Sequence, residues 1–282
     1  TAARLGKNHF VITTTTGAAG PVMSHLEFCA QCLWPELDVK MISVTEQWAQ
    51  VAVAGPKSRE LLAEMIDDIS DTALPYMGCG EVLIGDIKAR LFRISFSGEM
   101  AFEIAVPAKY GEALMDTLVK RADALGGGAY GMEALNVLRI EKGFLTHAEM
   151  DGRASAADLG MSGMMSKNDF IGKVASQRAG LNHKDREQLV GIKPVGAVRQ
   201  ILGGSIMVNE EDLPIRENMV GHVTSVCYSP TLDGMIGLAF VKGGHARIGQ
   251  HIRAVDLLRN VDTLCEIVSP QFYDPNGEKP RG

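Results

Sequence analysis

The sequence lacks the marks of several protein classes. No apolar run approaches the roughly 18 residues of a transmembrane helix, and the opening TAARLGKNHF contains no signal-peptide core. Lysine and arginine number 28 against 34 aspartates and glutamates, which gives a net charge of −6 and no basic stripe with interleaved aromatics. These absences argue against a membrane protein and against a nucleic-acid partner. They predict a soluble, cytoplasmic protein.

Cysteine is also scarce, because only five cysteines occur in 282 residues, scattered and odd in number. This pattern argues against a disulfide framework. Cys29 and Cys32 form a C-x-x-C pattern, but apolar residues at helical spacing around them, such as Val22, Leu26 and Leu33, favour buried helix cysteines over a thiol or zinc site. The seven histidines form no two-ligand pattern, so we predict no metal site.

Two catalytic signatures are absent or out of context. No G-x-S-x-G nucleophile elbow occurs. The stretch GGGAYG (126–131) has the spacing of a dinucleotide fingerprint, but it follows a helical pattern and not a strand. We therefore expect these glycines to end a helix.

Strand-like and helical segments alternate in the first half of the chain, which predicts an α+β layer. Runs rich in β-branched or alternating apolar residues predict strands at 9–16, within 39–55, at 81–95 and at 100–106. Helical patterns begin near Pro21, Pro56 and Pro107.

Short strand-like runs with turn residues between them follow Leu189, and they predict a small antiparallel barrel or sandwich. Between the two halves, 162–188 is polar, with one helical candidate near 173–178. We predict a first domain over 1–161, a connecting segment over 162–188 and a second domain over 189–282.

The stretch FRISFSGEMAFEI (92–104) places two carboxylates four residues apart. In an extended strand Met100, Phe102 and Ile104 share one face, and Glu99, Ala101 and Glu103 share the other. The small side chain between the carboxylates leaves room for a flat ring, and a carboxylate accepts two parallel N–H bonds from an amino-pyrimidine edge, as in a pteridine. The alternative is a solvated face with two exposed glutamates.

Four stretches together resemble, in order and spacing, the tetrahydrofolate-binding aminomethyltransferase family of the glycine-cleavage T-protein: FSGEMAFEI, GMEALNVLRIEKGF, DLGM followed by SKNDFIGK, and GHVTSVCYSPTLDGMIGLAFV. The resemblance covers nearly the whole chain. Within the family, ARLGKNHFVITTTTG, SVTEQWAQVAVAGPKSR, EALNVLRIEKGF and SPQFYDPNGEKPRG resemble the carboxy-terminal part of the alpha subunit of heterotetrameric sarcosine oxidase.

The resemblance implies a truncated, T-protein-like folate-binding α+β domain with antiparallel sheets and helices, followed by a small C-terminal β-barrel. It also implies oxidative demethylation of sarcosine, with the one-carbon unit captured as 5,10-methylenetetrahydrofolate. The cofactor of this chain would be tetrahydrofolate. FAD, FMN and NAD would belong to the full complex, and the partners would be a flavin-bearing beta subunit and small subunits.

The resemblance also assigns residues. Glu103 matches the family's pterin-binding carboxylate, with Glu99 in the same block, and Phe96 matches an aromatic residue of the folate pocket. Thr15 falls in a strand-end segment near the folate. Arg139 matches the arginine of L-R-L-E-A-G, although a surface helix arginine paired with Glu133 or Glu141 is the alternative.

Two departures from the family pattern bear on activity. Leu135 stands where the T-protein has a folate-contacting arginine, which favours the sarcosine oxidase branch. The family's catalytic aspartate would lie before residue 1, so we expect little activity from the chain alone. One alternative is a T-protein that uses an aminomethyl-lipoyl carrier, and another is a scaffold for a flavin-bearing subunit. A third is a non-catalytic folate-binding module like the related iron–sulfur-cluster assembly proteins. Those proteins carry a K-G-C-x-x-G-Q-E motif, whereas the comparable stretch here, EKGFLTHAEMDG, has no cysteine.

Overall fold

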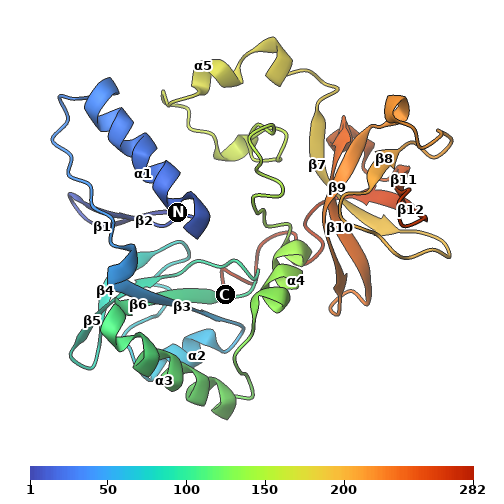
Figure 1. Cartoon of the computed structure of the whole chain (residues 1–282). Coiled ribbons are helices and arrows are strands. Elements are labelled where there is room, and N and C mark those ends of the chain that lie inside the picture. The colour runs from blue at the N-terminus through green and yellow to red at the C-terminus, as the bar shows by residue number, and fades with distance from the viewer. The chain divides into compact units, whose positions relative to one another are not determined.

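The computed structural model describes all 282 residues, which form two compact units. The sheet unit comprises 1–95, 99–129 and 279–282, and the barrel unit comprises 96–98 and 130–278. Each unit combines antiparallel strands with helices, and one contains a closed barrel (Figure 1), so the predicted α+β class with a C-terminal β-barrel is confirmed. None of the helices is both long and apolar enough to cross a bilayer.

The sheet unit is built on a four-stranded antiparallel sheet in the order β3-β6-β5-β4. Its strands are β3 (Trp48–Ala54), β4 (Cys79–Ile84), β5 (Ile87–Phe92) and β6 (Ala101–Pro107). Helices α2 (Ser58–Ala63) and α3 (Gly111–Ala124) cover one face (Figure 1). Phe102 and Ile104 point into this face and are fully buried against Leu62, Leu114 and Leu118, as strand alternation requires.

A two-stranded hairpin of β1 (Ala2–Gly6) and β2 (His9–Ile12) packs on the other face of the sheet, where Ala3 contacts Phe92 and Ala105. The expected strand over 9–16 therefore ends at Ile12, and its partner β1 was not predicted. Residues 39–44 form no strand although they are rich in β-branched side chains, since no neighbouring strand pairs with them.

Helix α1 (Ala19–Phe28) begins near Pro21, as predicted, and continues as a π-helical turn over Cys29–Leu33. Cys29 is buried, as expected, and its thiol lies 3.7 Å from His25 Nε2. Cys32 is exposed, which corrects the expectation that both cysteines are buried. Because Leu33 is also 46% exposed, the apolar stripe of this helix is only partly covered within the sheet unit.

The glycines after α3 terminate that helix, as predicted. Gly126 has a left-handed φ of 78°, and the N–H groups of Gly126 and Gly127 donate to the carbonyls of Asp123 (3.0 Å) and Ala122 (2.7 Å). This is the Schellman pattern, in which a glycine satisfies the last carbonyls of a helix.

Six antiparallel strands close the barrel in the order β10-β7-β12-β11-β8-β9. They are β7 (Glu187–Pro194), β8 (Ile206–Val208), β9 (Gly221–Ser229), β10 (Gly234–Lys242), β11 (His251–Asp256) and β12 (Val261–Val268). Alternate side chains of these strands form a buried interior that includes Val190, Met207, Val223 and Ile252. The short strand-like runs predicted after Leu189 correspond to these six strands.

Helix α4 (Met132–Lys142) packs on the outside of the barrel, where Ile140 joins Leu189, Leu238 and Phe240. It ends at Gly143, whose φ is 73°. Helix α5 (Lys173–Ser176) is a single turn in the polar segment before β7. The domain boundaries at 161 and 188 stay predictions, because the two compact units divide the chain at other residues.

Candidate functional site

Glu103 lies in the middle of β6, on the sheet face that the hairpin covers and opposite Phe102 and Ile104. Its neighbours in the ladder are Ala52 on β3 and Phe92 on β5. The strand alternation predicted for this stretch therefore places Glu103 as expected. No lysine or arginine forms an ion pair with this carboxylate.

Gln50 on β3 supplies the hydrogen bond that Glu103 receives, from its side-chain Nε2 to Oε2. Burial raises the pKa of Glu103 above its ordinary value, and the hydrogen bond from Gln50 and the positive charge of the Thr1 amino group oppose that shift in part. A half-buried carboxylate that forms no ion pair with a lysine or arginine is suited to accept N–H groups from a ligand.

The remaining predicted residues of the sheet unit are Glu99 and Thr15. Glu99 is partly buried and stands just before β6. Thr15 is exposed and precedes the short turn Thr16–Ala18, where its carbonyl accepts the N–H of Ala18 at 2.9 Å. Their roles in folate binding stay predictions.

Phe96 and Arg139 lie together in the barrel unit, linked through Phe144. The rings of Phe96 and Phe144 stack with centroids 5.9 Å apart and an interplanar angle of 16°. Arg139 Nη1 lies 3.3 Å from the Phe144 carbonyl oxygen, to which it donates. Phe96 is 40% exposed, so one side of this aromatic pair is available for contact.

Arg139 is buried and belongs to a polar cluster inside the barrel unit. Its guanidinium donates to Glu149 (3.3 Å), to Ser225 Oγ (2.8 Å) and to Asn136 Oδ1 (2.9 Å). The alternative of a surface pair with Glu133 or Glu141 is wrong, because the carboxylate partner is Glu149 from the following loop. Glu141 is itself buried and accepts hydrogen bonds from Ser229 and Thr231.

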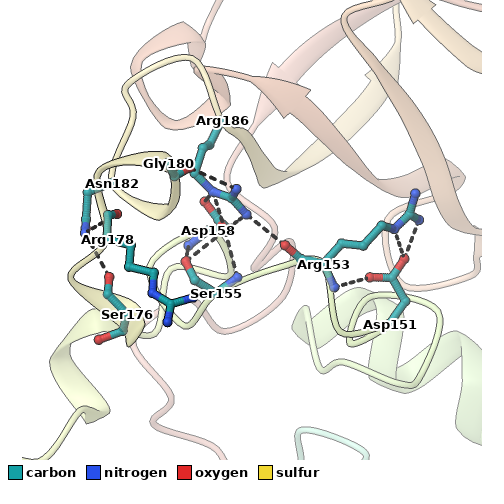
Figure 2. A network of polar contacts seen from close by, with 9 residues as sticks. All are labelled: Asp151, Arg153, Ser155, Asp158, Ser176, Arg178, Gly180, Asn182 and Arg186. Atoms are coloured by element: carbon teal, nitrogen blue, oxygen red, sulfur yellow. Dashed lines mark hydrogen bonds and ion pairs between the residues drawn. The ribbon is translucent and has the colours of Figure 1, made fainter. Parts of the chain in front are cut away.

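A second cluster ties the polar segment before β7 to the loop after α4 (Figure 2). Arg186 donates from Nε and Nη2 to the Asp158 carboxylate at 3.0 and 2.6 Å, and to the carbonyl of Arg153 at 2.8 Å. Ser155 caps the same carboxylate through its N–H and hydroxyl. Burial raises the pKa of Asp158, but the hydrogen bonds from Arg186 and Ser155 outweigh it, so the pKa is lowered.

A cavity of about 280 Å³ lies beside this cluster. Acidic, basic and uncharged side chains line it: Asp151, Arg153, Ala154, Arg186, Glu187, His222 and Phe240. The guanidinium of Arg186 is held by Asp158 and that of Arg153 by Asp151, while His222 faces Glu187 at 3.4 Å. Since its charged groups pair with one another or with neighbours, the cavity offers no unpaired cation to an anionic ligand. No group of three or more His, Cys, Asp and Glu side chains gathers to hold a metal ion.

Gln50 is the site residue that the sequence prediction missed. Alternation along 48–53 indicates that Gln50 shares a face with Trp48 and Ala52, but it does not say which strand lies beside that face. The pairing of β3 with β6 supplies this information, and it could have been predicted only by matching two strands 53 residues apart.

Two family models match the chain. Residues 1–169 match the GCVT N-terminal domain, and residues 187–274 match the glycine cleavage T-protein C-terminal barrel domain. The second match coincides with the closed barrel, which begins at Glu187.

Curated relatives include the sarcosine oxidase alpha subunits of Rhizobium meliloti (strain 1021), 46% identical, and of Corynebacterium sp. (strain P-1), 37% identical, each aligned over 99% of this chain. The chain spans 29% of the length of either. An aminomethyltransferase of Caldanaerobacter subterraneus subsp. tengcongensis is 29% identical over 86% of this chain and 63% of its own length.

A solved structure shares the fold. The crystal structure of glycine cleavage system aminomethyltransferase T from Bartonella henselae aligns with a TM-score of 0.75, covering 97% of this chain and 71% of that one, at 22% identity.

Proposed function

Because the chain belongs to the glycine cleavage T-protein family, we propose that it is the tetrahydrofolate-binding part of a sarcosine oxidase alpha subunit. It captures the one-carbon unit of sarcosine as 5,10-methylenetetrahydrofolate. The identity of 46% over 99% of the chain with one such subunit, against 29% over 86% with an aminomethyltransferase, supports this branch of the family.

The observation that carries the proposal is the state of Glu103. Its carboxylate is half-buried, forms no ion pair with a lysine or arginine, and keeps one oxygen without a hydrogen-bond partner. The amino group and the adjacent ring N–H of a pterin are two parallel donors, and a carboxylate satisfies both at once. In this proposal Glu103 fixes the pterin. The role of Phe96 as an apolar contact for folate rests on the family resemblance alone.

A flavin in the partner subunit would supply the two-electron oxidation of sarcosine to its imine, and oxygen would take up those electrons to give hydrogen peroxide. The folate N5 would be the nucleophile toward the imine carbon and N10 would close the ring, and the two protons that N5 and N10 lose would leave on the amine nitrogen of glycine. Holding both reactants together makes the capture effectively unimolecular and limits escape of formaldehyde.

Two further elements are part of the proposal. The flavin-bearing beta subunit and the small subunits are the partners, and FAD, FMN and NAD bind elsewhere in the complex. Oxidase activity requires those partners, so the chain alone contributes folate binding without turnover. Glu99, Thr15 and Arg139 contribute to the folate site or support it.

The test is titration of the folded chain with tetrahydrofolate by anaerobic calorimetry, with Glu103→Gln as the variant. We expect saturable binding that the variant loses, because a neutral amide presents only one acceptor to the two donors. Glu112→Gln, at an exposed position in α3, is the matched control and should bind like the parent chain. Equal binding by Glu103→Gln and the parent chain would contradict the assignment of Glu103.

The second candidate function is aminomethyl transfer within the glycine cleavage system, which the shared fold and the aminomethyltransferase relatives support. The two functions differ in the one-carbon donor. Incubation of the complete complex with sarcosine, tetrahydrofolate and oxygen should yield methylenetetrahydrofolate and peroxide. An aminomethyl-lipoyl carrier as the productive donor would favour the second function.

A further inference from the structure

Gln50 and Glu103 come from adjacent antiparallel strands and meet on the same face of the sheet. Ala52 stands directly opposite Glu103, and Gln50 stands opposite Ala105. Gln50 is therefore the diagonal neighbour of Glu103, a position within reach of a long side chain. Its amide Nε2 donates to Oε2 of the carboxylate.

The space behind this pair is closed. Gln50 and Glu103 line a cavity of about 10 Å³ together with residues of the hairpin and of β5, among them Val11, Thr13 and Phe92. A volume of that size holds about one water molecule and excludes a pterin ring. A ring bound by Glu103 therefore lies outside this cavity.

The charged groups near Glu103 do not replace Gln50. Arg90 shares the sheet face, but its guanidinium lies over the Trp48 ring, 3.8 Å from the centroid, and its electrostatic partner is Glu81. The amino group of Thr1 lies near the cavity, where its charge lowers the pKa of Glu103, but its hydrogen bond of 2.8 Å goes to the Thr13 carbonyl and not to the carboxylate. Gln50 is thus the side chain that orients the carboxylate.

We propose that Gln50 is a positioning residue for folate: its amide holds the Glu103 carboxylate in one orientation, with the other oxygen free for the pterin. This inference rests on the proposed function of Glu103. The hydrogen bond satisfies one lone-pair direction of Oε2, and so aligns the remaining lone pairs with a bidentate donor before the ligand arrives.

If Gln50 has this role, tetrahydrofolate binding should depend on pH in a definite direction. Tetrahydrofolate binding through a carboxylate is lost as the pH falls through the pKa of Glu103. A donor such as Gln50 stabilises the ionised form, so its removal moves the loss of binding to higher pH. Arg90 and the Thr1 amino group are unchanged in such a variant, so the difference between the two profiles reports the amide alone.

The experiment measures tetrahydrofolate binding by the 282-residue chain across a pH series, for the parent chain, Gln50→Met and Gln50→Glu. Methionine keeps the size of the side chain without the donor, and we expect about tenfold weaker binding at neutral pH with an upward shift of the pH profile. Glutamate places a second carboxylate beside the first, and a larger upward shift should follow.

Gln188→Met is the matched control, because Gln188 lies on β7, away from β3 and β6. Its side-chain Oε1 accepts a hydrogen bond from the backbone N–H of His245. Its binding and pH profile should match those of the parent chain. The Glu103 carboxyl can also be titrated by NMR in the absence of folate, and Gln50→Met should raise its midpoint if the variant is folded.

The outcomes separate the two proposals. A Gln50→Met profile that superimposes on that of the parent chain, with Glu103 still required for binding, would overturn the role of Gln50 alone. Binding that does not depend on Glu103 would overturn the proposed site, and with it the functional part of this inference.

Discussion

Arg139 and Glu149 form an ion pair of 3.3 Å in which both side chains are buried, with exposed fractions of 5% and 0%. Ser225 on β9 joins them, since its hydroxyl donates to Glu149 Oε1 at 2.6 Å and accepts from Arg139 Nη2 at 2.8 Å. The cluster thereby connects α4, the loop that follows it and the barrel wall.

Glu149→Gln should lower the free energy of unfolding by about 3–5 kcal/mol, because the Arg139 charge would stay buried without its carboxylate. Urea unfolding followed by circular dichroism measures the change. Glu112→Gln, at an exposed position of α3, should stay within about 0.5 kcal/mol of the parent chain. A loss of that small size in Glu149→Gln as well would show that the pair adds nothing.

The stability of the chain should fall in acid, in part through Glu149. Burial raises the pKa of Glu149, but hydrogen bonds from Ser225, Thr146 and Thr224 and the charge of Arg139 together lower it below the ordinary value of 4.5. A lowered folded-state pKa contributes stability at pH values above 4.5, and this contribution disappears as the pH falls through the folded-state pKa. Thermal unfolding across pH should show this loss in the parent chain and a flatter acid limb in Glu149→Gln.

Glu103→Gln should weaken folate binding but raise the stability of the folded chain. The raised pKa of Glu103 means that folding disfavours its ionised form, so the native state is most stable, relative to the unfolded chain, when this group is protonated. A neutral glutamine removes that cost, and the midpoint of thermal unfolding at neutral pH should rise by a few degrees.

The gain from Glu103→Gln should shrink as the pH falls through the raised pKa, because the parent carboxyl is then neutral too. Differential scanning calorimetry of both proteins at several pH values is the measurement. A fall of the midpoint at neutral pH would indicate that Glu103 supports the fold and is not held for a ligand.

Thiol reactivity should separate the cysteines sharply. Burial raises the pKa of Cys227 to about 11 and that of Cys265 to about 12, so almost no thiolate is present at either position in neutral solution. Cys32 is exposed. Native protein should therefore react rapidly with a disulfide reagent at Cys32, and at Cys227 and Cys265 only after denaturation.

Cys32→Ser supplies the control for that labelling, since it should remove the rapid phase. A rapid phase that survives the substitution and maps to Cys265 by mass spectrometry would contradict the buried position of that thiol on β12.

Local patterns predicted much of this fold. Alternation correctly predicted that Glu103 and Phe102 lie on opposite faces of the sheet. The glycines at 126–128 correctly predicted the end of α3, and turn residues correctly predicted the breaks between the barrel strands. Each of these features depends on residues within one element, where periodicity and backbone freedom decide the outcome.

Features that depend on distant partners were not predictable from those patterns. Arg139 has acidic residues within its own helix, yet it pairs with Glu149 and with Ser225, which is 86 residues away. Gln50 lies 53 residues from Glu103. Strand propensity at 39–44 produced no strand, because no other strand pairs with that segment.

The closed barrel and the open sheet differ in how they expose backbone N–H and C=O groups. In the barrel every strand has a partner on both sides, whereas β3 and β4 each border the four-stranded sheet with one side unpaired. An unpaired strand side is a template for pairing between molecules. Heat-induced aggregates of this chain should therefore grow from β3 and β4, and charged substitutions on those two strands are the ones that should keep it dispersed.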